Sequence, residues 1–114
     1  MGAITTHILD TARGQPAAGV PVRLEVHSAT QGWKVLATGH TDSDGRVKNF
    51  LPSGERLEPG TYRLTFDAAQ YFRGHGLEAF FPEVSLVFRV RDAAEHYHVP
   101  LLLSPYGYTT YRGS

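Results

Sequence analysis

The sequence predicts an all-β fold, a two-sheet antiparallel β-sandwich of about eight strands with one short helix. Short runs of β-branched and aromatic residues recur with a period of two, as expected of strands. Clusters of Gly, Pro, Asp and Ser separate these runs. The chain has 114 residues, enough to bury roughly two-thirds of its unfolded surface without a metal or a disulfide. We therefore expect a single domain over residues 1–114.

Alternation is clearest in Val20–His27, where four aliphatic side chains share one face and Arg23, Glu25 and His27 share the other. Such a strand is half buried. Eight segments with strand character in so short a chain favour a sandwich or a barrel. In chain order, the predicted strands are Ile4–Leu9, Val20–His27, Trp33–Thr38, Arg46–Phe50, Tyr62–Phe66, Val84–Val90, Tyr97–Leu103 and Tyr106–Arg112.

Local signals also predict one hairpin and one helix. Asp44-Gly45 stands between the third and fourth predicted strands, and this pair tolerates the positive φ of a tight turn. The helix is predicted over Asp67–Arg73, with Asp67 as its N-cap and Gly74 closing it. At about two turns, it is a connection rather than part of the core.

Composition excludes several classes of partner. Eleven Lys and Arg balance eleven Asp and Glu, and nucleic-acid binding normally needs a basic excess. No stretch approaches the roughly twenty apolar residues of a membrane span. The first twenty residues lack a secretory signal pattern. We expect a cytoplasmic protein, or a periplasmic or organellar one if a leader was removed. With no cysteine, a metal site would need His, Asp or Glu.

Three histidines are candidate functional residues. His7 shares a strand face with Thr5 and Leu9, while Ile4, Thr6 and Ile8 point the other way. His96 and His98 are two residues apart, so their side chains project from one face of a strand. Two imidazoles on one face suit proton transfer, and they also suit half of a zinc site. The spacing alone leaves both alternatives open.

The tail, residues 106–114, alternates tyrosines with small residues and ends directly after a strand. Tyrosine supplies contact area and a polar tip at low entropic cost. This pattern favours a tail held in an interface over a frayed end.

These residues resemble a known family. Ile4–Val20 is similar to the opening signature of transthyretin-related proteins, and His96–Ser114 is similar to their closing signature. The resemblance covers essentially the whole chain. A terminal Tyr-Arg-Gly-Ser, with His in the first strand, Arg after the hairpin and His in the seventh strand, is typical of hydroxyisourate hydrolases within that family. Here these residues are His7, Arg46, His98 and Tyr111–Ser114.

The resemblance implies a transthyretin-like homotetramer, a dimer of dimers with its sites where two dimers meet. It implies hydrolysis of 5-hydroxyisourate to 2-oxo-4-hydroxy-4-carboxy-5-ureidoimidazoline during urate breakdown, without cofactor or metal. Carried over residue by residue, it assigns catalysis to His7, Arg46, His98 and Ser114, and substrate binding to His7, Arg46, Tyr111, Arg112 and Gly113.

These residue types can open a cyclic amide, which needs an activated water, oxyanion stabilisation and a proton for the leaving nitrogen. We expect His7 and His98 to move protons, in an undecided order, and Arg46 to hold the substrate through paired hydrogen bonds. Tyr111 would shape the pocket wall, and Arg112 would position the tail by pairing with a neighbouring subunit. Ser114 would offer its hydroxyl and, as the last residue, a carboxylate.

Two other functions remain open. A transthyretin-like carrier could bind a small, thyroid-hormone-type ligand in the same channel, although it would need neither paired imidazoles nor the terminal tetrapeptide. A zinc-dependent hydrolase could use His7, His96 and His98 as its three protein ligands.

Overall fold

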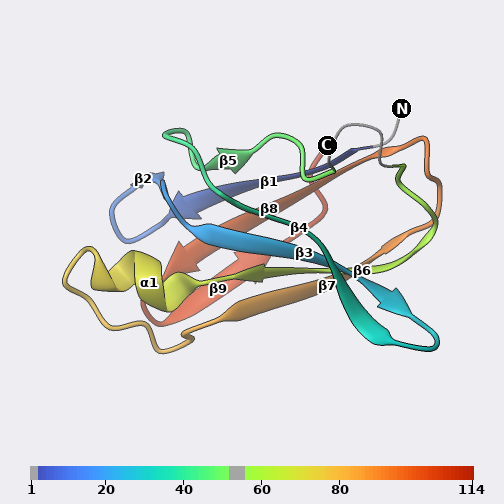
Figure 1. The fold of residues 1–114 in the computed structure, drawn as a ribbon. Coiled ribbons are helices and arrows are strands. Elements are labelled where there is room, and N and C mark those ends of the chain that lie inside the picture. The colour runs from blue at the N-terminus through green and yellow to red at the C-terminus, as the bar shows by residue number, and fades with distance from the viewer. Residues whose placement is uncertain (1–2, 52–55) are drawn as a thin grey trace.

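The computed structural model describes residues 3–51 and 56–114. Its strands form two β-sheets that pack face to face (Figure 1). One sheet has the order β2-β1-β8-β9, with β5 also paired to β1, and the other has the order β4-β3-β6-β7. The first contains β1 (Ala3–Asp10), β2 (Gln15–Pro16), β5 (Arg46–Val47), β8 (His96–Ser104) and β9 (Gly107–Thr110). The second contains β3 (Pro21–Ser28), β4 (Gly32–His40), β6 (Gly60–Phe66) and β7 (Val84–Val90). The predicted two-sheet sandwich is confirmed.

The alternation of residues in the sequence did not predict which strands would run parallel. β1 and β8 lie side by side and run parallel, whereas the other strand pairs in the described residues are antiparallel. The parallel register places Thr5 opposite His98 and Ala3 opposite His96. The short strand β2 was also missed, because two residues that include Pro16 carry no alternation signal.

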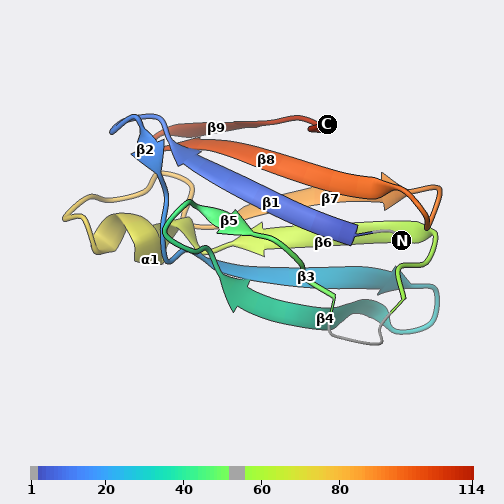
Figure 2. The same cartoon turned by 90° about the horizontal axis from the view of Figure 1, so that it is seen from above.

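The predicted hairpin at Asp44-Gly45 is wrong, although the tight turn exists. The N–H of Gly45 donates to the carbonyl of Asp42 at 2.9 Å, and Gly45 has a φ of 74°. The strands on its two sides enter different sheets, β4 pairing with β3 and β5 pairing with β1. Turn chemistry sets the local bend but not the strand partner. Figure 2 shows β5 beside β1, across the sandwich from β4.

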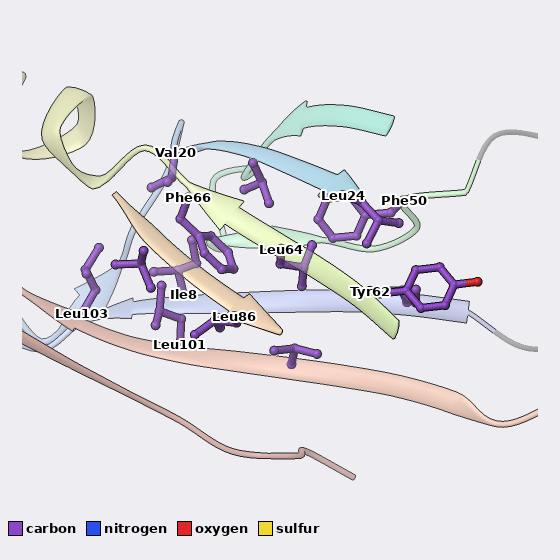
Figure 3. Close-up of a cluster of buried hydrophobic side chains, with 14 of the residues drawn as sticks. Ile8, Val20, Leu24, Phe50, Tyr62, Leu64, Phe66, Leu86, Leu101 and Leu103 are labelled. Carbon is purple, nitrogen blue, oxygen red and sulfur yellow. The ribbon is translucent and has the colours of Figure 1, made fainter. Parts of the chain in front are cut away.

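The core lies between the inward faces of the two sheets (Figure 3). Ile8 and Leu101 from one sheet meet Leu24, Leu64 and Phe66 from the other, and none of these five is accessible to solvent. Full burial of one such side chain is worth about 1.5–3 kcal/mol. The inward positions are therefore fixed by packing, and the outward positions of β1 and β8 are left free for other chemistry.

The predicted helix is confirmed as α1 (Ala68–Arg73), which closes one end of the sandwich (Figure 1). The carboxylate of Asp67 accepts from the N–H of Gln70 at 3.0 Å, as an N-cap should. The Tyr71 hydroxyl donates to Asp10 at 2.7 Å, which ties the helix to the end of β1. Among the described residues, no helix is long and apolar enough to cross a membrane.

Candidate active site

The outward face of β1 and β8 carries the histidines. Along β1, Thr5 and His7 are half-buried, while Ile4, Thr6 and Ile8 are buried on the core side. On β8, the core side takes Tyr97, Val99, Leu101 and Leu103. His96 and His98 therefore lie on the outward face, next to Thr5 across the parallel ladder.

Arg46 reaches the same face through β5. In the β1–β5 ladder, Arg46 lies directly opposite His7, and opposed residues of an antiparallel pair point to the same side of the sheet. Gly45 makes this placement possible. Its carbonyl accepts from the N–H of Ile8 at 2.8 Å, and a Cβ at this position would lie 2.5 Å from the carbonyl oxygen of Ile8. A larger residue at position 45 would push Arg46 away from β1.

The C-terminal tail is anchored to His98. The N–H of Gly113 donates to the carbonyl of His98 at 2.8 Å, outside the regular ladder of β8 and β9. This bond brings Ser114 to the outward face of β8. The tail thereby joins the residues that β1, β5 and β8 present.

These elements border an open pocket of about 460 Å³, which we take as the candidate active site. Of the predicted catalytic residues, Arg46, His98 and Ser114 line it, and His7 lies on the same face without lining it. Tyr111 and Arg112 line a different cavity of about 290 Å³, beside β7. The residues that line the candidate site are Thr5, Thr6, Arg46, Val47, Lys48, His96, His98 and Ser114.

A larger cavity, about 710 Å³, lies against the other sheet around Arg23, His40 and Glu83. We place the chemistry in the smaller cavity because imidazole, guanidinium and hydroxyl groups converge there. Convergent polar groups in a concave site are a better indication of function than volume.

The site favours a neutral imidazole at His98. Burial lowers the pKa of His98 from its usual value of 6.5, and the positive charges of Arg46, His7 and His96 lower it further. A neutral imidazole can accept a proton near neutral pH. Its Nδ1 lies 2.8 Å from the hydroxyl oxygen of Thr5, and Nε2 of His96 lies 2.9 Å from that same oxygen.

Sequence reasoning did not select Thr5 or Lys48 as site residues. Thr5 is two residues from His7 and Lys48 is two residues from Arg46, so the period of a strand places each beside a predicted site residue. That signal was available from the sequence. The contact of Thr5 with His98 was not, because it depends on the register between β1 and β8.

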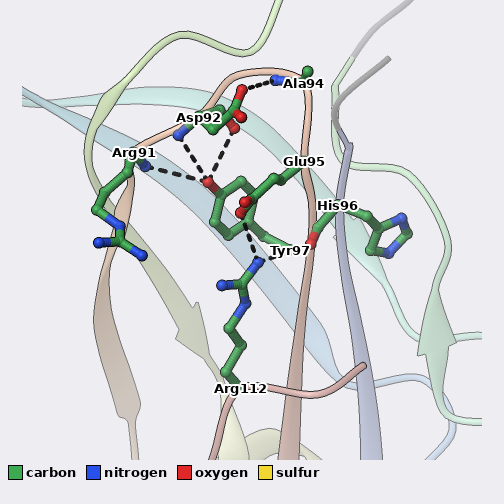
Figure 4. A network of polar contacts seen from close by, with 7 residues as sticks. All are labelled: Arg91, Asp92, Ala94, Glu95, His96, Tyr97 and Arg112. Carbon is green, nitrogen blue, oxygen red and sulfur yellow. Dashed lines mark hydrogen bonds and ion pairs between the residues drawn. The ribbon is translucent and has the colours of Figure 1, made fainter.

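Within the single chain Arg112 pairs with Glu95, and its predicted pairing with a neighbouring subunit stays a prediction (Figure 4). Its guanidinium donates to Glu95 at 3.0 Å and to the carbonyl of His96 at 3.4 Å, and it lies 4.8 Å from the ring centre of Tyr97. The Tyr97 hydroxyl in turn holds the turn before β8, by accepting from the N–H of Asp92 and donating to its carbonyl, both at 3.0 Å. Arg112 therefore fixes the tail to the start of β8.

The three histidines do not form the zinc site considered above. Within residues 3–51 and 56–114, no group of three or more His, Cys, Asp or Glu side chains is arranged to hold a metal ion. His96 and His98 instead share the hydroxyl of Thr5.

The fold and site define a transthyretin-like sandwich with a pocket of histidine and arginine on one outward face. A family model described as "HIUase/Transthyretin family" matches residues 4–113. The chain belongs to this family.

Three relatives illustrate its range. A 5-hydroxyisourate hydrolase from Salmonella dublin is 51% identical over 111 residues, which cover 97% of this chain and 80% of that protein. The structure of Klebsiella pneumoniae 5-hydroxyisourate hydrolase has a TM-score of 0.85 at 37% identity, covering 98% of this chain and 99% of that one. Sea bream transthyretin in complex with thyroxine has a TM-score of 0.90 at 33% identity, covering 97% and 94%.

Proposed function

We infer that this chain is an enzyme that hydrolyses 5-hydroxyisourate to 2-oxo-4-hydroxy-4-carboxy-5-ureidoimidazoline in urate degradation. The observation that carries the inference is that His98, Arg46 and Ser114 line one cavity, although they come from three separate parts of the chain. The similarity to hydroxyisourate hydrolases over nearly the whole chain supports the same reaction.

Each residue type has a role in opening the cyclic amide. A neutral imidazole, His98 or His7, accepts a proton from water, and the resulting hydroxide adds to the ring carbonyl carbon. Arg46 holds the substrate and stabilises the oxyanion that forms. The C–N bond then breaks as the protonated imidazole returns a proton to the ring nitrogen. No cofactor takes part in this scheme.

Ser114 can donate or accept one hydrogen bond at the substrate through its hydroxyl. Gly113 supports the site by holding the tail to His98. We propose that Tyr111, with 57% of its surface exposed in the single chain, and Arg112 reach the substrate only in the assembled protein.

That assembly is proposed to be a homotetramer, a dimer of dimers with sites where the dimers face each other. Two observations support it. The candidate site is an open pocket on the outward face of a sheet, and the aromatic side chains Tyr106, Tyr108 and Tyr111 are exposed on or beside β9. Light scattering after gel filtration tests it, with four times the chain mass of 12.6 kDa expected. A monomer with full activity would contradict it.

The direct test of function adds the protein to freshly prepared 5-hydroxyisourate and follows its ultraviolet decay against the spontaneous rate. We expect acceleration by the wild type and near-spontaneous decay with a folded His98→Ala variant. Absence of acceleration by folded wild type would overturn the proposed function.

The alternative is a carrier for a thyroid-hormone-type ligand, which the fold of the sea bream protein allows. The pocket argues against it, because imidazole, guanidinium and hydroxyl groups suit a polar substrate better than an aromatic hormone. Titration with thyroxine measures this directly. We expect no saturable binding at micromolar concentrations, and tight binding without turnover of hydroxyisourate would favour the carrier.

A further inference from the structure

We propose that Thr5 is a positioning residue whose hydroxyl bridges His96 and His98 and selects the tautomer in which His98 can act as a base. The proposal rests on the proposed hydrolase function. It adds two residues, Thr5 and His96, to the machinery described above.

The geometry of the bridge is specific. The Thr5 hydroxyl oxygen lies 2.9 Å from Nε2 of His96 and 2.8 Å from Nδ1 of His98, both ordinary hydrogen-bond distances. The two imidazole centres are 6.5 Å apart, too far for a direct hydrogen bond between the rings. Thr6, the next residue, instead bonds to a main-chain carbonyl, that of Val99. The Thr5 hydroxyl is therefore the connection between the two imidazoles.

A hydroxyl has one proton to donate, so its two hydrogen bonds are not independent. When the proton points to Nε2 of His96, the oxygen accepts from His98, which then carries its proton on Nδ1. In this tautomer Nε2 of His98 has a free lone pair and is a base. Among the described residues, Nε2 of His98 has no hydrogen-bond partner, so this nitrogen is available to a water molecule.

The opposite arrangement produces an acid. If His96 is protonated, its Nε2–H donates to Thr5, and the Thr5 proton turns towards Nδ1 of His98. A neutral His98 then carries its proton on Nε2, where it can be donated. Whether Nε2 of His96 carries a proton, which it always does when His96 is charged, thus selects through one hydroxyl whether His98 accepts or donates a proton. Charged groups near this pair include His7 on β1, Arg46 on β5 and Lys48 just after it, and the Arg112–Glu95 ion pair, whose guanidinium also bonds to the carbonyl of His96.

The variants Thr5→Val and Thr5→Ser test the bridge. Valine has nearly the same shape without the hydroxyl, and serine keeps the hydroxyl. We expect Thr5→Val to lower kcat for hydroxyisourate about 10- to 100-fold, less than the roughly 10²- to 10⁴-fold contribution of proton transfer itself, because Thr5 positions the base without replacing it. KM should change less than about threefold, and Thr5→Ser should keep kcat within about threefold of the wild type. Thr38→Val is the matched control, an exposed threonine on β4 in the other sheet, and should match the wild type.

A second readout does not depend on turnover. Nitrogen-15 NMR of the free protein distinguishes the Nδ1–H and Nε2–H tautomers of each histidine. We expect His98 in the wild type to change tautomer as His96 is titrated, and this link to disappear in Thr5→Val or in His96→Leu. If Thr5→Val does not fold, Thr5→Ala and His96→Leu provide the same comparison.

Two results would overturn the bridge. One is a folded Thr5→Val variant with the kcat of the wild type. The other is a Thr5→Val variant in which the tautomer of His98 still changes with the protonation of His96 as it does in the wild type. In addition, the double variant Thr5→Val/His96→Leu should lose no more activity than Thr5→Val, because both changes break one path. If the wild type itself fails to accelerate the reaction, the proposed function is wrong, whereas the tautomer measurement still decides the bridge.

Discussion

Gly113 lies directly against the imidazole of His98, in addition to bonding to its carbonyl at 2.8 Å. A Cβ at position 113 would lie 2.5 Å from Cδ2 of His98 and 3.0 Å from Cγ of Pro100. Both neighbours are ring atoms, so neither can move without turning or shifting a whole side chain. The imidazole of His98, the proposed base, therefore leaves no room for a side chain at position 113, which explains the glycine of the terminal tetrapeptide.

Gly113→Ala is expected to displace the imidazole of His98 and to lower kcat about tenfold or more, because small misplacement of a reacting group is costly. The fold should persist, since position 113 lies at the edge of the structure. The assay is hydroxyisourate decay, with thermal unfolding measured alongside. Gly39→Ala on β4, where an added Cβ would meet no atom within 4 Å, is the matched control. Equal activity in the two variants would contradict this role of Gly113.

Much of the fold could be predicted because burial alternates strictly along β1 and over parts of β3 and β8. In Ile4–Leu9, the residues facing the core are buried and the others are half-buried, as the period of two requires. The capping Asp67 likewise has a local cause, a carboxylate that accepts from a nearby N–H. These features depend on neighbours within a few residues.

What could not be predicted depends on contacts between distant segments. No local pattern places β5 beside β1 or sets Thr5 opposite His98. The tail is a similar case, because the partner of Arg112 is known only once the turn before β8 is placed. The sequence could therefore identify His98 and Arg46 as candidates, but not the hydroxyl between His96 and His98.

The pKa of His98 should depend on Arg46. Burial is the largest cause of its lowered pKa and the Arg46 charge is the next, so Arg46→Gln should raise this pKa towards 6.5. His7 and His96 also lower it when they are protonated. An NMR titration of the His98 ring measures the change. In the wild type, activity should fall with acid only below pH 6.5, because His98 stays neutral above its own lowered pKa. An unchanged pKa in Arg46→Gln would contradict the electrostatic link.

Lysine should not replace Arg46. Arginine presents a planar set of donors that can bind two substrate oxygens at once, whereas lysine is a single point charge. We expect Arg46→Lys to lower kcat/KM about 10- to 100-fold, which corresponds to about 1.4–2.7 kcal/mol of lost transition-state stabilisation. Arg73→Lys, at the exposed end of α1, is the control. Nearly full activity in Arg46→Lys would show that charge alone is sufficient.

Arg112→Ala is expected to separate activity from stability. The Arg112–Glu95 ion pair is about half exposed, at 55% and 46% of the two side chains, and exposed pairs contribute about 0–1 kcal/mol. Thermal unfolding should therefore change little. Activity should fall about tenfold, because the tail loses its ion pair, its bond to the carbonyl of His96 and its contact with the ring of Tyr97.

Glu95→Gln should lower activity less, since Arg112 keeps its contact with the ring of Tyr97 and its hydrogen bond to the carbonyl of His96. Arg73→Ala removes the same charge from the surface of α1 and serves as the control for net charge. If Arg112→Ala unfolds at a much lower temperature than Arg73→Ala, Arg112 stabilises the fold itself. If Arg112→Ala keeps wild-type turnover, anchoring of the tail at this residue is not needed to keep Ser114 and Gly113 at the site.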